Sequence, residues 1–221
     1  MDANLLYKIF GWTLFFVTTA ALIFGLKYSI KHKHRSVLKV FPFYSLFSIV
    51  ELTISAFNIP NLFFIIRNWF PLLELLVFFI FFNSVLSTKW VKMLLPFLFL
   101  IFLSDCIVLS IDSPNPEKFN LGNAYTVESL LLILPAAFYF KETFQSRSDV
   151  ILSTDTSFWL TTGISVFALS SIPLSSFQWV FSSQMNEKWL LILVPVIALP
   201  YIIMNILFIK GFTCKMKILQ L

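Results

Sequence analysis

Residues 69–88 read WFPLLELLVFFIFFNSVLST, an apolar run that contains one charged residue, Glu74. A helix needs about 20 mostly apolar residues to cross the hydrocarbon core of a bilayer, and this run has that length. The run therefore predicts a transmembrane helix. Its start is less sharply defined, because LFFII at 62–66, just before Arg67, either extends the helix or forms an interfacial segment.

The rest of the chain has the same apolar character. Of its 221 residues, 58% are hydrophobic, 12% are charged and 28 residues are phenylalanine. Soluble domains carry about 25% charged residues and about 45–50% apolar ones. A globular core of this size could not bury so much apolar surface. The composition therefore predicts an all-α, multi-pass membrane protein formed by one domain, residues 1–221.

Seven segments are long and apolar enough to cross a bilayer. They are about 9–27, 40–58, 69–88, 92–111, 122–141, 157–179 and 189–209. Prolines inside several of them predict kinks rather than helix ends, since neighbouring helices satisfy the freed backbone groups. The connecting loops are short, so none of them is expected to hold a separate catalytic domain.

Basic residues indicate how the spans are oriented, because cytoplasmic loops carry the excess of lysine and arginine. With the N-terminus outside, twelve basic residues lie on the cytoplasmic side and four lie outside. The outer four are Lys8, Arg67, Lys118 and Lys188. The net charge of +5 thus reflects topology rather than nucleic-acid binding. We expect a seven-transmembrane-helix bundle with its N-terminus outside and its C-terminus in the cytoplasm.

Four acidic residues fall inside the predicted spans: Glu51, Glu74, Asp105 and Glu128. Each costs about 2.5–3.5 kcal/mol at the centre of a membrane helix on insertion scales. Counted at about 1.5 Å per residue from the outer end of each span, all four lie roughly 8–10 Å deep. A common depth on four successive helices predicts one shared site, an acidic cavity that faces outward.

Polar residues at helical spacing support this cavity. In the second span they follow steps of four, three, four and three residues: Tyr44, Ser48, Glu51, Ser55 and Asn58. Such steps place side chains on one face of a helix. Tyr125 shares a face with Glu128, and Arg67 stands two turns before Glu74. The predicted ligand- or ion-binding site therefore comprises the four acids with Arg67, Tyr125, Ser48 and Ser55.

The charge of this site constrains its contents. Neighbouring carboxylates repel one another, and removal from water disfavours their charged form. We therefore expect the cavity to hold a proton, a metal ion or a small cationic ligand, with Arg67 compensating Glu74. The alternative interpretation is that these polar residues only hydrogen-bond neighbouring helices, at about 0.6–2 kcal/mol each.

Missing residues disfavour several classes of protein. The last span has no lysine before Lys210, so it lacks the Schiff-base residue of a retinal protein. The two histidines, His32 and His34, stand in a basic loop, which argues against a histidine metal site within the membrane. The sequence has no GxSxG, HExxH or P-loop motif. No cofactor is expected, and enzymatic activity stays open only through a pair of acidic residues.

Three segments resemble a group of short seven-helix membrane proteins common in Bacteroidota: NWFPLLELLVFFIFF at 68–82, YTVESLLLILPAAFYF at 125–140 and TSFWLTTGISVF at 156–167. Members of that group tend to show an acid in the third helix, an acid early in the fifth and an FW…G pattern opening the sixth. Many also carry a tyrosine after that pattern, near the place where Phe167 stands here. The resemblance implies a bacterial inner-membrane location and no particular chemistry.

These expectations favour a sensor- or receptor-like protein that binds a small ligand from outside and acts through a cytoplasmic or membrane signalling partner. A small proton- or cation-coupled transporter and a subunit of a membrane complex are the alternatives. The transporter is ranked second, because no acidic residue falls in the inner half of a span to continue a pathway. The expected partners are the lipid bilayer, a small cationic ligand or proton and the signalling partner, but no nucleic acid.

Overall fold

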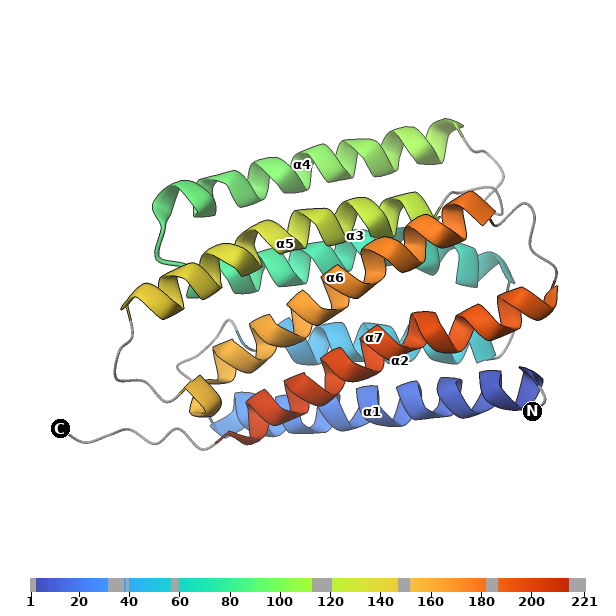
Figure 1. Ribbon diagram of the computed structural model, residues 1–221, viewed down its shortest axis with the longest axis horizontal. Coiled ribbons are helices and arrows are strands. Elements are labelled where there is room, and N and C mark those ends of the chain that lie inside the picture. The colour runs from blue at the N-terminus through green and yellow to red at the C-terminus, as the bar shows by residue number, and fades with distance from the viewer. Residues whose placement is uncertain are drawn as a thin grey trace.

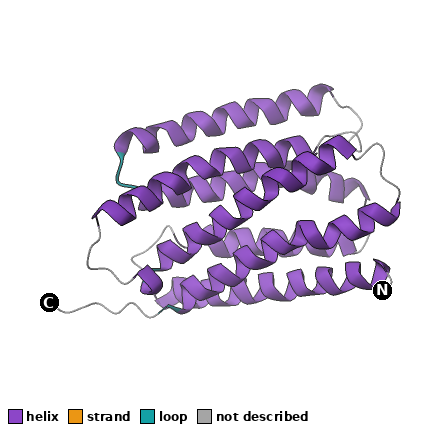
Figure 2. Ribbon diagram, viewed as in Figure 1, coloured by secondary structure: helices purple, strands orange, loops and turns teal. Residues whose placement is uncertain are grey.

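The computed structural model describes residues 3–31, 38, 40–56, 60–112, 121–146, 152–181 and 187–214. Within these residues all regular structure is helical, and no strand is present. Their seven α-helices are α1 (Ala3–Lys31), α2 (Val40–Ala56), α3 (Pro60–Val85), α4 (Lys89–Asp112), α5 (Leu121–Ser146), α6 (Thr156–Phe181) and α7 (Glu187–Thr213). A short 3-10 helix, η3 (Leu152–Thr154), precedes α6. The predicted all-α fold is confirmed (Figure 2).

The helices lie lengthwise beside one another and alternate in direction, which places the two termini at opposite ends of the bundle (Figure 1). α7 packs against α1 and α6, and α6 packs against α5. α2 packs between α1 and α3. α4 lies at one edge of the bundle and contacts α3 and α5.

The observed helices follow the predicted spans closely, because each predicted span overlaps one helix. The largest difference is in α3, which begins at Pro60 rather than near Trp69, so that the LFFII segment is helical. Prolines stand inside α3, α4, α5, α6 and α7 without ending these helices. The expectation that these prolines do not end the spans is therefore confirmed, and the kinks stay a prediction.

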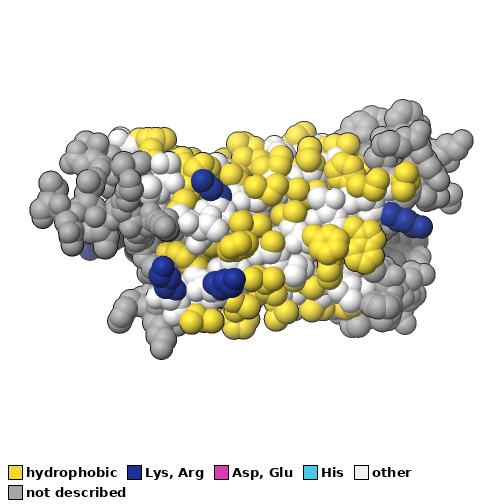
Figure 3. Space-filling view, turned by 90° about the horizontal axis from the view of Figure 1, so that it is seen from below, with side chains coloured by type: hydrophobic (Ala, Val, Ile, Leu, Met, Phe, Trp, Pro, Cys, Tyr) yellow, Lys and Arg dark blue, Asp and Glu magenta, His cyan; other side chains and the backbone are white. Residues whose placement is uncertain are grey.

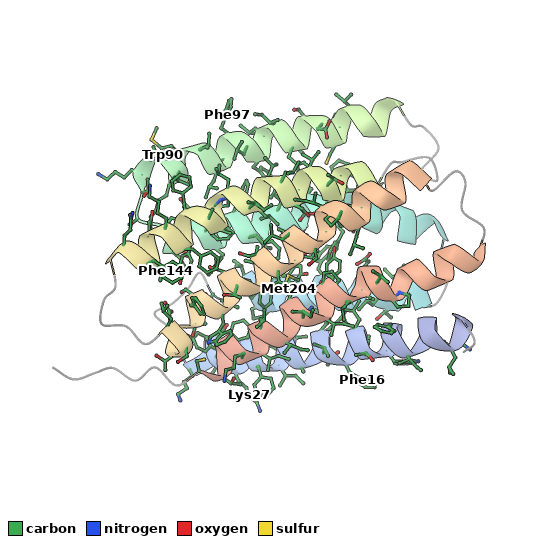
Figure 4. All side chains as sticks on the ribbon, viewed as in Figure 1. Phe16, Lys27, Trp90, Phe97, Phe144 and Met204 are labelled. Carbon is green, nitrogen blue, oxygen red and sulfur yellow. The ribbon has the colours of Figure 1, made fainter. Side chains whose placement is uncertain are left out.

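The outer surface of the bundle is strongly apolar. Phe16 of α1 is 63% exposed and Phe97 of α4 is 60% exposed, and both point away from the bundle (Figure 4). Soluble proteins rarely expose apolar surface of such extent. Four helices contain a stretch that is long and apolar enough to cross a membrane: Lys8–Lys31, Lys89–Val108, Ala124–Gln145 and Thr156–Ser175. Shorter apolar stretches are found at Val40–Ile54, Trp69–Val85 and Ala198–Thr213. These features are those of a helical membrane protein.

Lysine side chains mark the two ends of this apolar surface. On the face seen in Figure 3 they gather near one end of an apolar band and are sparser at the other. Because the helices alternate in direction, six lysines with described side chains come to the end where α7 stops: Lys27, Lys31, Lys89, Lys92, Lys141 and Lys210. Lys8 lies at the opposite end, near the start of α1. We call the first of these the basic end.

Phenylalanines from three helices fill the interior next to the basic end. Phe41 of α2 lies 5.0 Å from Phe208 of α7 and 5.1 Å from Phe81 of α3, measured between ring centroids. Phe78 lies 6.3 Å from Phe41 and 6.4 Å from Phe208. All four side chains have 0% exposure. We call these four residues the aromatic layer.

Close contact between α6 and α7 depends on a residue without a side chain. A Cβ atom on Gly163 would stand 3.0 Å from Cε1 of Phe208 and 3.2 Å from the carbonyl oxygen of Met204. The second of these atoms belongs to the backbone, so it cannot move aside cheaply. Small residues serve this purpose in membrane proteins because they let helix backbones approach.

We expect Gly163→Leu to lower the free energy of unfolding by about 1–3 kcal/mol, the usual cost of overpacking an interior. Gly11→Leu is the matched control, because a Cβ at Gly11 would meet nothing within 4 Å. The thermal unfolding midpoints of the two variants in detergent micelles measure the difference. Equal midpoints would show that α6 and α7 are not tightly packed at Gly163.

Candidate functional site

Glu74 lies near the middle of its helix. It stands fourteen residues after Pro60, the first residue of α3, and eleven before Val85, the last. At a rise of about 1.5 Å per residue, the first interval spans about 21 Å. Counted instead from Trp69, where the apolar stretch Trp69–Val85 begins, Glu74 is five residues in, about 8 Å, so the predicted depth stays a prediction. The two distances differ because α3 continues back from Trp69 to Pro60, a point that the sequence left undecided.

Two tyrosines approach the Glu74 side chain, which has 0% exposure. The hydroxyl of Tyr44 in α2 donates a hydrogen bond to Oε1 of Glu74 at 2.9 Å. The hydroxyl of Tyr201 in α7 faces Oε2 at 3.5 Å, which is longer than the 2.5–3.0 Å range of strong hydroxyl hydrogen bonds. Three helices that are distant in sequence thus meet at one carboxyl group.

Glu128 in α5 is the second buried acid, also with 0% exposure. Neither of its carboxyl oxygens has a hydrogen-bond partner among the described residues. Glu128 lies within electrostatic range of Glu74, and Glu51 in α2 also lies within electrostatic range of Glu74. The structure therefore brings together three of the four predicted acids, which we call the acid cluster: Glu51, Glu74 and Glu128.

The fourth acid, Asp105, has a different setting. It lies on α4 at the edge of the bundle and is partly exposed. Asp105 acts electrostatically on the adjacent Cys106, which in turn acts on Glu128. Asp105 therefore lies on the edge helix α4, whereas the acid cluster is formed by α2, α3 and α5.

The other predicted site residues divide into three groups. Tyr125 is partly buried and lies within electrostatic reach of Tyr201, at the acid cluster. Ser48 is buried, but its hydroxyl donates to the backbone carbonyl of Tyr44 at 3.1 Å, one turn earlier in the same helix. The side chains of Ser55 and Arg67 lie outside the described residues.

Tyr201 is the main site residue that the sequence did not reveal. Its hydroxyl lies 3.5 Å from Glu74, and it also interacts electrostatically with Tyr125 and Glu128. One signal was present: a tyrosine within an apolar span carries a hydroxyl that needs a partner. One turn further along α7, Asn205 donates from Nδ2 to the Tyr201 carbonyl at 2.9 Å, and its own Oδ1 is buried without a partner among the described residues.

Tyr44 connects the acid cluster to the aromatic layer. Its ring lies 5.3 Å from Phe78 and 6.4 Å from Phe208, both in that layer. Its hydroxyl holds Glu74 on the other side. A change at the Glu74 carboxyl group can therefore be transmitted to the packing next to the basic end.

This arrangement is suited to holding one positive charge. An isolated carboxylate buried in an apolar interior is costly, and such groups are neutralised or paired. Two interacting carboxyl groups with no described basic partner can together bind a proton or a cation. The described residues contain no group of three or more histidine, cysteine, aspartate or glutamate side chains that could hold a metal ion.

Comparisons with known proteins give no relative for this site. No protein-family model matches the chain, and neither a curated protein nor a solved structure shows detectable similarity to it. The chemistry of the site must therefore be argued from its own geometry.

We expect Tyr44→Phe to lower the free energy of unfolding by about 1–3 kcal/mol, because it leaves a buried carboxyl oxygen without its donor. Tyr201→Phe removes a hydroxyl at 3.5 Å and should cost less. Denaturant titration in mixed micelles measures both values. In a Glu74→Met background the effect of Tyr44→Phe should disappear, because the two side chains are coupled. An equal loss in both backgrounds would contradict the hydrogen bond.

Proposed function

We propose that this protein is a seven-span transporter of the bacterial inner membrane, with its N-terminus outside, in which a buried acid pair binds and releases a proton or a small cation. The resemblance to short inner-membrane proteins supports the location. The number of spans is supported by the seven helices of the described residues, each of 17 or more residues. The lysines of the basic end support a cytoplasmic C-terminus.

The single observation that carries the transport function is the state of Glu128. Its carboxyl group is fully buried, has no hydrogen-bond partner in the described structure, and interacts with Glu74. An ionisable residue inside a membrane protein is by default a candidate for an ion or proton pathway. A carboxyl pair in this condition changes its charge when it binds or releases one cation.

The position of Glu74 favours transport over sensing. From the sequence, a sensor was favoured over a transporter because the predicted acidic residues are confined to the outer half of the spans. Glu74 lies fourteen residues from the start of α3 and eleven from its end, and Asn205, one turn after Tyr201 in α7, continues the polar groups toward the basic end. Transporters commonly bind their ions near the midplane and expose them alternately to the two sides. Because Glu74 and Glu128 are fully buried, access from either side requires movement of helices.

A sensor is the second candidate, and the contacts of Tyr44 favour it. A ligand that neutralised Glu74 would weaken the charge-assisted hydrogen bond from Tyr44. Tyr44 contacts Phe78 and Phe208, so the change would reach the basic end, where a cytoplasmic partner could bind. This function would require no passage of ions across the membrane.

Flux through proteoliposomes separates the two functions. We expect the purified protein to dissipate an imposed pH gradient faster than empty liposomes do, as reported by a trapped pH-sensitive dye. Glu128→Gln should reduce this rate at least tenfold, because the amide cannot bind and release the ion. Asp105→Asn is the matched control and should leave the rate unchanged, since Asp105 lies on the edge helix. Flux equal to that of empty liposomes, with H⁺, Na⁺ or K⁺ gradients, would reject transport.

The orientation can be tested at Cys214, which follows α7 at the basic end. Its thiol donates to the Ser153 carbonyl at 3.3 Å, and burial raises the pKa of Cys214. A raised pKa lowers the thiolate fraction at neutral pH, so labelling should be slow at pH 7 and faster as the pH rises. We expect a membrane-impermeant maleimide to label Cys214 in inverted vesicles but not in intact spheroplasts.

A cysteine at the other end provides the comparison. Lys8→Cys in a Cys214→Ser background should be labelled in intact spheroplasts and not in inverted vesicles. Cys106 is buried and contributes little to either reaction. Labelling of Cys214 in intact spheroplasts would reverse the proposed orientation.

A further inference from the structure

We infer that the ion bound at this site is a proton rather than a metal cation, and that Glu128 and Glu74 exchange it through the hydroxyl of Tyr201. This inference rests on the proposed function, since it identifies the ion held by the same acid pair. It is carried by the hydrogen-bond geometry of the two carboxyl groups and by the side chains that surround them.

The groups around the acid pair do not form a cage for a metal ion. Hard cations such as Ca²⁺ take about six to eight oxygen ligands, and Mg²⁺ keeps several waters. Both oxygens of Glu74 instead face tyrosine hydroxyls, and the shorter contact is a donated hydrogen bond. Fully buried leucines adjoin the acids along their helices: Leu75 follows Glu74, and Leu132 lies one turn after Glu128. Among the described residues, no group of three or more histidine, cysteine, aspartate or glutamate side chains could hold a metal ion.

A proton needs much less from its surroundings. A protonated carboxyl group is neutral, and one acceptor is enough for its O–H group. Glu128 has no donor on either oxygen among the described residues, so its neutral form suits the apolar site. Glu74 receives the hydroxyl of Tyr44 at 2.9 Å, and donated hydrogen bonds stabilise a carboxylate. The geometry thus assigns the proton to Glu128 and the negative charge to Glu74 in this state.

Tyr201 is placed to pass the proton between the two acids. It lies within electrostatic reach of both, and its hydroxyl oxygen is 3.5 Å from Oε2 of Glu74. In the transfer, Glu128 gives its proton to the Tyr201 oxygen while Tyr201 gives its own hydroxyl proton to Oε2 of Glu74. Glu128 is left as a carboxylate, Glu74 as an acid, and Tyr201 is unchanged. No oxidant, reductant or further reactant is required.

The observed state is one in which this transfer is interrupted. The contact of 3.5 Å must shorten to about 2.7 Å for an effective hydroxyl hydrogen bond. Glu128 also has to turn toward Tyr201, since it has no partner in the described structure. Pro200 precedes Tyr201 directly and cannot donate to the helix, so α7 can bend next to the hydroxyl that must move. Proton transfer and helix movement are therefore coupled at one residue.

Infrared spectroscopy of the full chain in lipid nanodiscs tests this inference without any measurement of transport. At neutral pH we expect the spectrum to contain the carbonyl-stretch band of a protonated carboxylic acid. Glu128→Gln should abolish the band, whereas the matched control Glu142→Gln should leave it unchanged. Glu142 serves as control because its oxygens accept hydrogen bonds from Ser87 and Thr88 at the turn between α3 and α4, which stabilise its charged form. A band that survives Glu128→Gln would overturn the assignment.

Metal ions and a second variant complete the test. At constant ionic strength, Na⁺, K⁺ or Ca²⁺ should leave the band in place, and its loss on addition of any of them would identify a metal site instead. Tyr201→Phe should retain the band and slow its shift in D₂O several-fold, because the relay hydroxyl is gone. An unchanged exchange rate would remove Tyr201 from the pathway. Glu128→Gln is nearly isosteric, and its unfolding midpoint confirms that the band is not lost through misfolding.

The two proposals fail separately in these experiments. A band with the expected response in a protein that shows no flux would reject the transporter and leave the proton site intact. Flux together with a band that Na⁺ removes would reject the proton and leave the transporter intact.

Discussion

The cost of burying a carboxyl group without a donor is the constraint on which the interior of this protein depends. The effective penalty for a buried charge is several kcal/mol even after relaxation. The chain shows two outcomes for its acids. Glu142 accepts hydrogen bonds at 2.7–2.8 Å from Ser87 and Thr88, which hold the start of α4 against α5. Glu128 receives none from the described residues, so nothing there stabilises its carboxylate form.

The contacts around Glu74 link the charge of this carboxyl group to the packing of several helices. α2, α3 and α7 meet there through Tyr44, Glu74 and Tyr201, and α5 contributes Glu128 nearby. The same tyrosine ring in α2 that donates to Glu74 also packs on the aromatic layer. A change in the charge of the acid pair consequently alters contacts among four helices, whereas a change at Glu142 affects one turn.

Most of the fold could be predicted from the sequence, because span length and composition are local properties. The start of α3 could not, because LFFII before Arg67 fits either a helix extension or an interfacial segment, and α3 in fact begins at Pro60. Asp105 was grouped with the other acids by depth. The depth of a residue does not reveal which helix lies at the edge of the bundle. The edge position depends on which helices pack together, and the periodicity of apolar residues does not encode this. Tyr201 was missed because the polar signal in α7 is short: only Tyr201 and Asn205, four residues apart on one face, interrupt the apolar run before Lys210.

α7 has a tightly packed part after Asn205 and a part before Tyr201 that can bend more easily. This difference determines where the helix can move to open the site. Beyond Asn205 the helix is fixed by close packing, since Phe208 fills the space beside Gly163, and Gly211 lies against Thr156, whose hydroxyl donates to the Gly211 carbonyl at 3.1 Å. Before Tyr201 the helix contains Pro195 and Pro200, each of which removes a backbone hydrogen bond. Movement of α7 should therefore begin at the prolines. Tyr201 stands at the boundary between these two parts, so bending of α7 changes its distance to Glu74 first.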